Sequence, residues 1–154
     1  MIIAETVENA VQMALTQVGK PYAIGGLDGN GRWVVRGKPS VHDSDPKDFD
    51  CSGFASWVVG QTGIILPDGC KAQRLYCKEL LAGDDDLSLD LWFADLHGDP
   101  APDHVVISIP GPNVIEARGP QVGKEYGRVI IRPKIVWIAQ KGFLGRFRVP
   151  GLYD

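Results

Sequence analysis

Apolar residues recur every three to four positions near the N-terminus, as they do on one face of a helix. The spacing predicts a helix over residues 6–18, in which Thr6 is a suitable N-cap and Gly19 with Pro21 ends the helix. The apolar positions are Val7, Val11, Leu15 and Val18. This segment therefore predicts an amphipathic helix with its apolar face on the rest of the protein.

Two further helices are predicted in the middle of the chain. One runs from about Cys51 to Gln61, where Asp50 is a plausible N-cap. The other covers about 69–82, with Asp68 as its cap and Gly83 at its end. The expected core face of the first of these two consists of Phe54, Trp57 and Val58.

The second half of the chain changes to short β-branched segments separated by Gly, Pro and Asn. These predicted strands read LDLWFAD, HVVISI, NVIEAR, GRVIIRPK and GRFRVP. Helices first and strands afterwards indicate an α+β fold, in which the N-terminal helices pack on a C-terminal antiparallel sheet. At 154 residues the chain is expected to form a single domain, residues 1–154.

A long polar stretch, residues 27–47, separates the first two predicted helices. It is rich in Gly, Asp and Ser and is longer than ordinary connections. It is therefore either a functional loop or a small hairpin around GRWVVRGK, residues 31–38. We refer to residues 27–47 as the insertion.

The composition is that of an ordinary globular protein, with 44% apolar and 23% charged residues. The net charge of −3 is uneven, because residues 1–117 hold 8 Lys/Arg against 17 Asp/Glu, whereas residues 118–154 hold 8 against 2. The basic tail could bind an anionic partner, or it could face the acidic part of the same domain. The second interpretation is favoured, and nucleic acid is not expected as a partner.

The N-terminal residues lack the basic start and apolar run of a secretory signal. No segment approaches the roughly 18 consecutive apolar residues of a membrane span, so membrane insertion is not expected. Three cysteines are too few for a disulfide framework and indicate synthesis in a reducing compartment. The expectation is a monomer made in the cytoplasm, which something else must deliver if it acts outside the cell.

Cys51 stands at the start of a predicted helix, in the sequence DFDCSGF. Unpaired amides and the positive end of the helix dipole favour a thiolate there, and the same amides can bind an oxyanion. The Asp50 carboxylate opposes this by raising the pKa of the thiol, whereas a cationic imidazole nearby would lower it. Cys51 is thus a nucleophile only if a histidine reaches it.

The chain has three histidines that could serve. His42 lies in the acidic segment VHDSD, which indicates a solvated loop rather than a metal site. His97 lies in a turn-like stretch with no evident partner. His104 opens the strand HVVISI, where its ring would project at the edge of the sheet.

The spacing between two predicted strands brings an acidic residue close to His104. If PGP forms a three-residue loop, Ile109 faces Asn113 and Val106 faces Glu116. His104 and Glu116 then lie diagonally on one face, within reach of a long side chain. Glu116 would then orient the imidazole. Without Cys51 and His104, Glu116 would be interpreted as a surface carboxylate on a strand.

These residues carry a family resemblance across nearly the whole chain. GKPYAIGG, DFDCSGF, LP at 66–67, DHVVISI and VIEA occur in the order found in the NlpC/P60 cysteine peptidases, which this sequence resembles. The resemblance implies a papain-like α+β fold and a cysteine-type hydrolase without metal or cofactor. It implies cleavage of peptidoglycan stem peptides, next to D-isoglutamate, through a thioester intermediate.

The resemblance also implies roles for individual residues. Cys51 would be the nucleophile, His104 the base and then acid, and Glu116 the orienting third residue. The family match further assigns Tyr22 to the oxyanion, and Asp50 and Ser52 to the stem peptide; Tyr22 is equally well explained as a core tyrosine. The chain departs from the family in using Glu as the third residue, in lacking a tryptophan before the two glycines, and in the longer insertion.

Cys70 and Cys77 have no counterpart in this machinery. Seven residues apart on one predicted helix, they are most simply small core fillers, and a zinc site with His97 is the weaker alternative.

Two rival functions remain open from the sequence. One is an amidase or acyltransferase using the same Cys–His pair, which a large apolar groove would favour. The other is an inactive domain that binds wall peptide or builds a phage tail, in which Cys51 would show no fast, pH-depressed reactivity. A phage-borne endolysin or tail enzyme, released by lysis or delivered by a particle, is the expected setting for the hydrolase.

Overall fold

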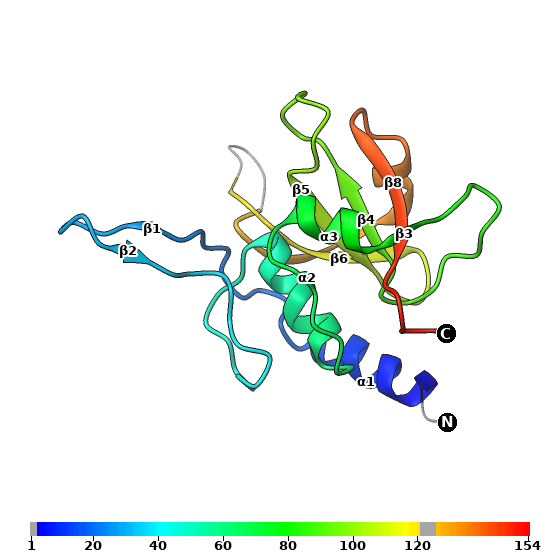
Figure 1. The fold of residues 1–154 in the computed structure, drawn as a ribbon, viewed down its shortest axis with the longest axis horizontal. Coiled ribbons are helices and arrows are strands. Elements are labelled where there is room, and N and C mark those ends of the chain that lie inside the picture. Colours follow the sequence, from blue (N-terminus) through cyan, green and yellow to red (C-terminus); the bar gives the residue numbers. More distant parts are fainter. Residues whose placement is uncertain (1–2, 121–125) are drawn as a thin grey trace.

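A six-stranded antiparallel sheet forms the centre of the molecule (Figure 1). The structure is a computed structural model that describes residues 3–120 and 126–154. The strands follow the order β3-β8-β4-β5-β6-β7, and every neighbouring pair is antiparallel. Their bounds are β3 Lys78–Glu79, β4 Leu91–Ala94, β5 His104–Ser108, β6 Asn113–Arg118, β7 Arg128–Pro133 and β8 Phe143–Arg148.

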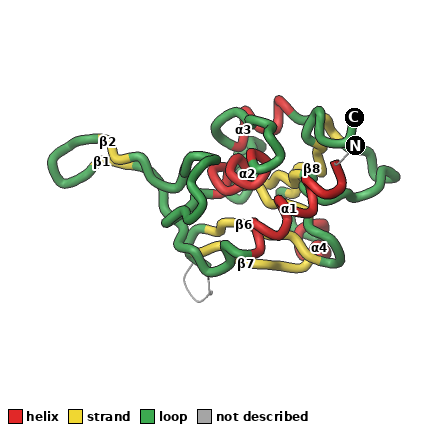
Figure 2. The backbone as a smooth tube through the Cα atoms, turned by 90° about the horizontal axis from the view of Figure 1, so that it is seen from below, coloured by secondary structure: helices red, strands yellow, loops and turns green. Residues whose placement is uncertain are grey.

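Helices cover both faces of this sheet. The helices are α1 Ile3–Leu15, α2 Cys51–Gly60, α3 Cys70–Tyr76 and α4 Lys134–Ile138. Helix α2 packs on β5 and β6 with eight of its ten residues buried, and α1 lies against α2. Figure 2 shows the short helix α4 across the strands from α2. The predicted α+β fold, with helices packed on an antiparallel sheet, is confirmed.

Alternation along the strands divides the interior into two clusters. In β4, Leu91 and Phe93 join the large cluster beneath the helices α1 and α2. Trp92 and Ala94 point to the opposite face, as successive strand residues do, and pack with Trp137 of α4. The side chain of Trp137 is 1% exposed. The functional side chains described below lie where these two layers meet at the start of β5.

The first helix is displaced from its predicted position. Helix α1 spans Ile3–Leu15 rather than 6–18, so Thr6 lies inside the helix and does not cap it. At the other end the backbone of Gly19 takes a φ of 93°, which favours glycine, and its N–H donates to Val129 O at 2.9 Å. The chain therefore leaves the helix early to join β7.

The third helix is shorter than the predicted 69–82. Gly69 is its N-cap, not Asp68, and it ends at Tyr76. The chain then extends because Lys78 and Glu79 pair with β8. A partner strand from the far end of the chain thus overrides the local helix preference, which sequence spacing does not show.

Helix α4 was not predicted. Its five residues follow β7 directly, and Pro133, at the end of that strand, is its N-cap. A helix of this length is too short to show a helical period in its sequence. It nevertheless places Trp137 under β5 and β6.

The insertion contains a hairpin that projects from the body of the molecule (Figures 1 and 2). Its strands are β1 Gly26–Leu27 and β2 Trp33–Val34, which pair antiparallel. A hairpin is thus present, but it spans residues 26–34 rather than being centred on residues 31–38. Beyond the hairpin, the chain returns to the body at Gly37, whose carbonyl accepts from Asp50 N at 2.8 Å.

The basic tail pairs with acidic residues of the same chain. Arg148 Nη2 lies 2.9 Å from Asp90 Oδ2, and Lys134 Nζ lies 2.6 Å from Asp86 Oδ2. These pairs agree with the interpretation that the tail faces the acidic half of its own domain. Among the described residues, every helix is too short or too polar to cross a bilayer.

Candidate active site

Cys51 is the first residue of α2, beneath a well-formed N-cap. Asp50 has extended backbone geometry, and its Oδ1 accepts from Gly53 N at 2.6 Å, which confirms it as the N-cap. The Cys51 side chain is 8% exposed and lines a cavity. The sulfur therefore lies at the positive end of a buried helix, close to amides that have no intrahelical acceptor.

The structure explains why the DCSG sequence has glycine at position 53. A Cβ on Gly53 would lie 1.9 Å from the carbonyl oxygen of Gly37, which is closer than real contacts allow. Gly37 itself has a φ of 77°, and its N–H donates to Asp48 at 2.7 Å. Both glycines are needed because the returning insertion crosses the first turn of α2 at backbone distance.

His104 and Glu116 meet in the predicted arrangement. Ile107 pairs with Ile115 and Ser108 with Val114, which is the register of a three-residue loop. His104 Nε2 lies 3.0 Å from Glu116 Oε1, and both side chains are buried. The diagonal contact inferred from the spacing is thus present, and the His104 ring also interacts with the side chain of Cys51.

Trp137 completes the support of the imidazole. Its Nε1 donates to Glu116 Oε2 at 3.0 Å, and its ring stacks on His104 with centroids 5.4 Å apart. Two arginines lie on the same carboxylate, since Arg118 and Arg132 Nη1 are 3.5 and 3.9 Å from Oε1. Glu116 is therefore held from several sides, and its position fixes that of His104.

The electrostatics of the pair favour a thiolate beside an imidazolium. A hydrogen bond with Cys70 lowers the pKa of the Cys51 thiol well below its usual range, burial opposes this, and the His104 ring lowers the pKa further. Burial lowers the pKa of His104, but hydrogen bonds with Cys51 and Glu116 and their negative charge raise it to about 9. Above the lowered pKa of the thiol and below that of the imidazolium both groups are charged, which is the reactive state of a cysteine nucleophile.

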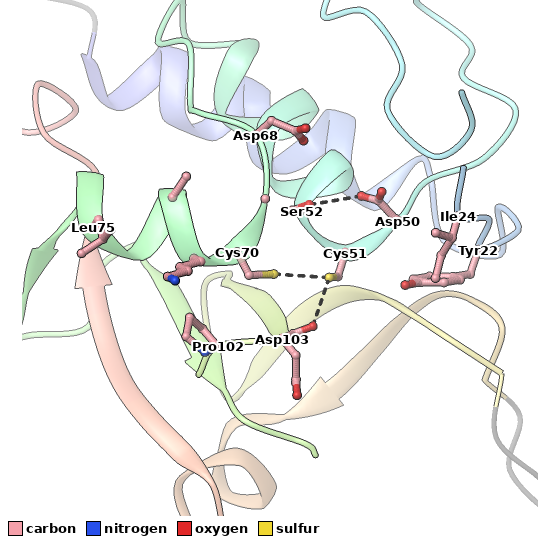
Figure 3. A pocket seen from close by; sticks show the side chains of 13 residues that line it. Tyr22, Ile24, Asp50, Cys51, Ser52, Asp68, Cys70, Leu75, Pro102 and Asp103 are labelled. Carbon is pink, nitrogen blue, oxygen red and sulfur yellow. Dashed lines mark hydrogen bonds between the residues drawn. The ribbon is translucent and has the colours of Figure 1, made fainter. Parts of the chain in front are cut away.

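Cys70 lies next to the candidate nucleophile. Its sulfur is 3.5 Å from that of Cys51, and the Cys51 sulfur also approaches Asp103 O at 3.8 Å (Figure 3). Cys51, Cys70 and Cys77 are all free thiols. The prediction that Cys70 and Cys77 fill the core holds for their burial, but for Cys70 it missed the contact with Cys51.

The predicted oxyanion and substrate residues surround Cys51. Tyr22 lines the same cavity of about 540 Å³, and its phenol is partly buried. Ser52 Oγ donates to Asp50 Oδ1 at 3.3 Å, so both residues face this cavity as expected. The Asp50 carboxylate is already engaged by Gly53 and by Lys38, whose Nζ lies 3.0 Å from Oδ2.

Lys38 brings the insertion into the site. Besides Asp50, it pairs with Asp68 Oδ1 at 2.7 Å and donates to Ser52 Oγ at 3.3 Å. Asp68, predicted as a helix cap, is instead a partner of this ammonium group. The long insertion thus brings a positive charge to Asp50, Ser52 and Asp68, which line the cavity beside Cys51.

A second cavity of about 570 Å³ lies on the His104 side. It shares Tyr22, Ile24 and Asp103 with the first cavity, so the Cys51–His104 pair separates two hollows. Arg118 and His97 line the second one. This arrangement can hold two parts of one extended chain on either side of the Cys51 sulfur.

The other histidines take no part in the pair. His42 is exposed in the insertion, as predicted for a solvated loop. His97 Nδ1 lies 2.9 Å from Asp103 Oδ2, a partner that the sequence did not indicate. Within the described part of the chain, Cys70, Cys77 and His97 do not converge into a zinc site.

Three carboxylates near β5 do converge, with donor atoms within 4.8 Å of one another: Asp95, Asp99 and Asp103. Two of them already cap the loop backbone. Asp95 Oδ1 accepts from Gly98 N at 2.8 Å, and Asp103 Oδ1 accepts from Leu96 N at 2.8 Å. We therefore interpret these acids as supports of the loop before β5.

Comparison with known proteins identifies the family. A model of the NlpC/P60 family matches residues 19–132, which include all the side chains of the pair and its carboxylate. The chain belongs to the NlpC/P60 family. The match confirms the resemblance drawn from the motifs around Cys51 and His104.

Relatives of this NlpC/P60 protein include enzymes of mycobacteria. A probable endopeptidase of Mycobacterium tuberculosis is 42% identical over 62 residues, which are 40% of this chain and 12% of that protein. A probable endopeptidase of Mycobacterium bovis matches with the same figures. The matched stretch therefore spans about an eighth of the length of these relatives.

Solved structures share the fold. The P60 domain of an antigen of Mycobacterium avium subspecies paratuberculosis has a TM-score of 0.67 at 20% identity and covers 97% of both chains. The peptidoglycan hydrolase RipB of Mycobacterium tuberculosis has a TM-score of 0.67 at 22% identity, over 96% of this chain and 66% of that one. At these identities the likeness confirms the fold alone.

The sequence analysis did not identify three residues that contact the side chains of the candidate site. Trp137 lies in an unpredicted helix, Cys70 lies on a different helix from Cys51, and Lys38 lies in the insertion. Their distances from Cys51 along the chain are 86, 19 and 13 residues, so no local spacing connects them. Only Lys38 carried a signal, since it is a basic residue in a Gly-rich segment adjoining DFDCSG.

Proposed function

We propose that this protein is a cysteine peptidase that hydrolyses peptide bonds in the stem peptides of peptidoglycan, with Cys51, His104 and Glu116 as its catalytic triad. The observation that carries the proposal is a buried thiol at a helix N-terminus beside an imidazole that a buried carboxylate orients at 3.0 Å. Family membership supports the hydrolase class, and the relatives named endopeptidase and peptidoglycan hydrolase support the substrate.

Acylation begins with attack of the Cys51 thiolate on the scissile carbonyl carbon. The negative charge moves to the carbonyl oxygen, where the Cys51 amide at the α2 N-terminus and the Tyr22 hydroxyl can donate. Burial raises the pKa of Tyr22, with the charges of Cys51 and Asp50 adding to it, so the phenol stays protonated as a donor. His104 then gives a proton to the leaving amine as the carbon–nitrogen bond breaks.

Deacylation regenerates the thiolate. His104, now neutral, takes a proton from a water molecule that attacks the thioester carbonyl. The carbon–sulfur bond breaks, the acid product leaves, and the thiolate and imidazolium are restored. Glu116 keeps the ring in place through both steps and stabilises its positive charge.

The positions of the two cavities suggest which part of the substrate each one binds. The acyl part would occupy the cavity lined by Cys51 and Ser52, because the thioester forms on that sulfur. The leaving amine would occupy the cavity lined by His104 and Arg118, because the imidazolium must protonate it. The proposed bond is next to D-isoglutamate, as the family resemblance implies.

Digestion of purified peptidoglycan tests this function. The wild-type protein should release peptide fragments whose masses identify the broken bond, in walls that carry diaminopimelate or lysine. Cys51→Ala should release none while keeping the wild-type circular dichroism spectrum, and Cys77→Ala, which changes a buried thiol outside the site, should cleave normally.

Two results would refute the assignment. Fragments released by Cys51→Ala would show that this sulfur is not the nucleophile. An unchanged wall with the wild-type protein, together with turnover of simple acyl amides, would favour the amidase or acyltransferase. The monomeric state and phage- or lysis-mediated delivery remain predictions, of which light scattering of the purified protein checks the first.

A further inference from the structure

The sulfur atoms of Cys51 and Cys70 form a buried contact that the peptidase mechanism does not use. They lie 3.5 Å apart, and the two side chains are 8% and 9% exposed. Figure 3 shows both sulfurs directed toward each other, with the residues of one cavity around them. This distance is that of an S–H···S hydrogen bond between two thiol groups that are not covalently joined.

The surroundings decide which sulfur carries the proton. Cys51 faces two groups that favour its anion, the His104 imidazole and the backbone N–H of Val105. The hydrogen bond with Cys51, burial, and the charges of Cys51 and Asp50 all raise the pKa of Cys70, and Lys38 only partly offsets them. These surroundings favour Cys51 as the acceptor and Cys70 as the donor.

Helix α3 is held so that the donor keeps its position. Gln73, one turn after Cys70, is fully buried. Its Nε2 lies 3.0 Å from Ser52 O and 3.0 Å from Ser56 Oγ, both in α2. The start of α3 is thus tied to the helix that carries Cys51, and Cys70 cannot move away without breaking these contacts.

We propose that Cys70 is a positioning residue for the nucleophile: its thiol donates a hydrogen bond to the Cys51 thiolate, which keeps this sulfur ionised and aimed into the cavity. The role belongs to the reaction put forward above as the proposed function and rests on it. The Cys70 hydrogen bond would thus stabilise the Cys51 thiolate in addition to His104.

The other titratable groups near the two sulfurs set the background for any pH profile. They are Tyr22, Asp50, His104, Lys38, Lys71, Asp68 and Asp103. A substitution at Cys70 leaves all of these side chains in the protein. A change in the ionisation of Cys51 after such a substitution therefore reports the loss of the Cys70 donor.

The test is the pH dependence of Cys51 alkylation by iodoacetamide, with the modified peptide identified by mass spectrometry and a phosphine present to keep thiols reduced. In Cys70→Ala the midpoint of the Cys51 profile should rise by about one pH unit, so that alkylation below the midpoint is about tenfold slower. Cys70→Ser, whose hydroxyl is a donor, should recover most of this shift. Cys77→Ala is the matched control and should follow the wild type.

Coincident profiles for wild type and Cys70→Ala would overturn the inference, as would equal shifts in Cys70→Ala and Cys70→Ser. Should Cys70→Ala fail to fold, infrared spectra decide the question in the Cys77→Ala background. The S–H stretch of Cys70 should then move to higher frequency when Cys51 is replaced by alanine, and an unmoved band would refute the hydrogen bond.

Because alkylation needs no substrate, the inference and the proposed function can fail separately. An enzyme that leaves peptidoglycan intact but shows the Cys70-dependent shift would lose the proposed substrate and keep the thiol pair. Digestion of the wall together with coincident alkylation profiles of wild type and Cys70→Ala would refute only the role of Cys70.

Discussion

The two halves of the proposed catalytic pair, Cys51 and His104, are built in different ways. On the sheet side, Glu116 is fully buried, joins His104 and Trp137 by hydrogen bonds, and has two arginines nearby. On the helix side, Cys51 contacts a second thiol and a backbone carbonyl and lines a cavity whose residues Asp50 and Asp68 pair with Lys38 of the insertion. The His104 imidazole is thus positioned by buried side chains of the core, whereas the ionisation of Cys51 depends on neighbours that belong to loops and helix ends.

This difference indicates where the chain can vary without losing its chemistry. The sheet side is a closed network in which each polar group depends on the others, so a change there affects folding and reaction together. The helix side depends on neighbours such as Lys38 and Cys70, which come from separate segments. Substitutions there should alter reactivity more than stability.

The largest expected effect is that of Glu116→Leu. It would leave His104 and Trp137 Nε1 without their buried acceptor and remove the negative charge beside the two nearby arginines. We expect the free energy of unfolding to fall by about 3–5 kcal/mol, measured by urea denaturation. The matched control is Glu79→Leu, which removes an exposed carboxylate from the edge strand β3. A fall in the free energy of unfolding no greater than that of the control would show that the polar groups on the sheet side do not depend on Glu116.

Gly53→Ala tests the helix side. Alanine normally stabilises a helix interior relative to glycine, by about 1 kcal/mol. Here the added Cβ would meet Gly37 O at 1.9 Å, so we expect destabilisation by about 1–3 kcal/mol and slower alkylation of Cys51 as the first turn of α2 shifts. Gly83→Ala, with open space around its Cβ, is the control. A Gly53→Ala variant more stable than the wild type would contradict the close approach of the Gly37 backbone to the first turn of α2.

The smallest change, Glu116→Gln, sharpens the comparison through pH. Leaving-group protonation needs the imidazolium, so peptidase activity should be lost as pH rises through the His104 pKa of about 9. The carboxylate helps to raise this pKa, so its neutral amide should lower it and move the alkaline limb down by about one pH unit. The measurement is the pH dependence of kcat. An alkaline limb in the same place would mean that Glu116 does not control the ring.

The sequence predicted local features of the site well. Asp50 caps α2 as expected, and the three-residue PGP loop gave the correct register for His104 and Glu116. Both depend on residues within a few positions of one another, where backbone geometry and hydrogen bonding are short-range. The errors occurred at α1, α3 and α4, where distant strands or short length override local preference.

The amino-acid sequence by itself determined the α+β class with its main helices and strands, the helix that begins at Cys51, and the strand pair that joins His104 to Glu116. Only the tertiary structure decided that Trp137 stacks on His104, that Lys38 reaches Asp50, and that the sulfur of Cys70 meets that of Cys51. The physical reason is separation along the chain. Capping and turn geometry act over a few residues, whereas these contacts form because packing brings separate segments together.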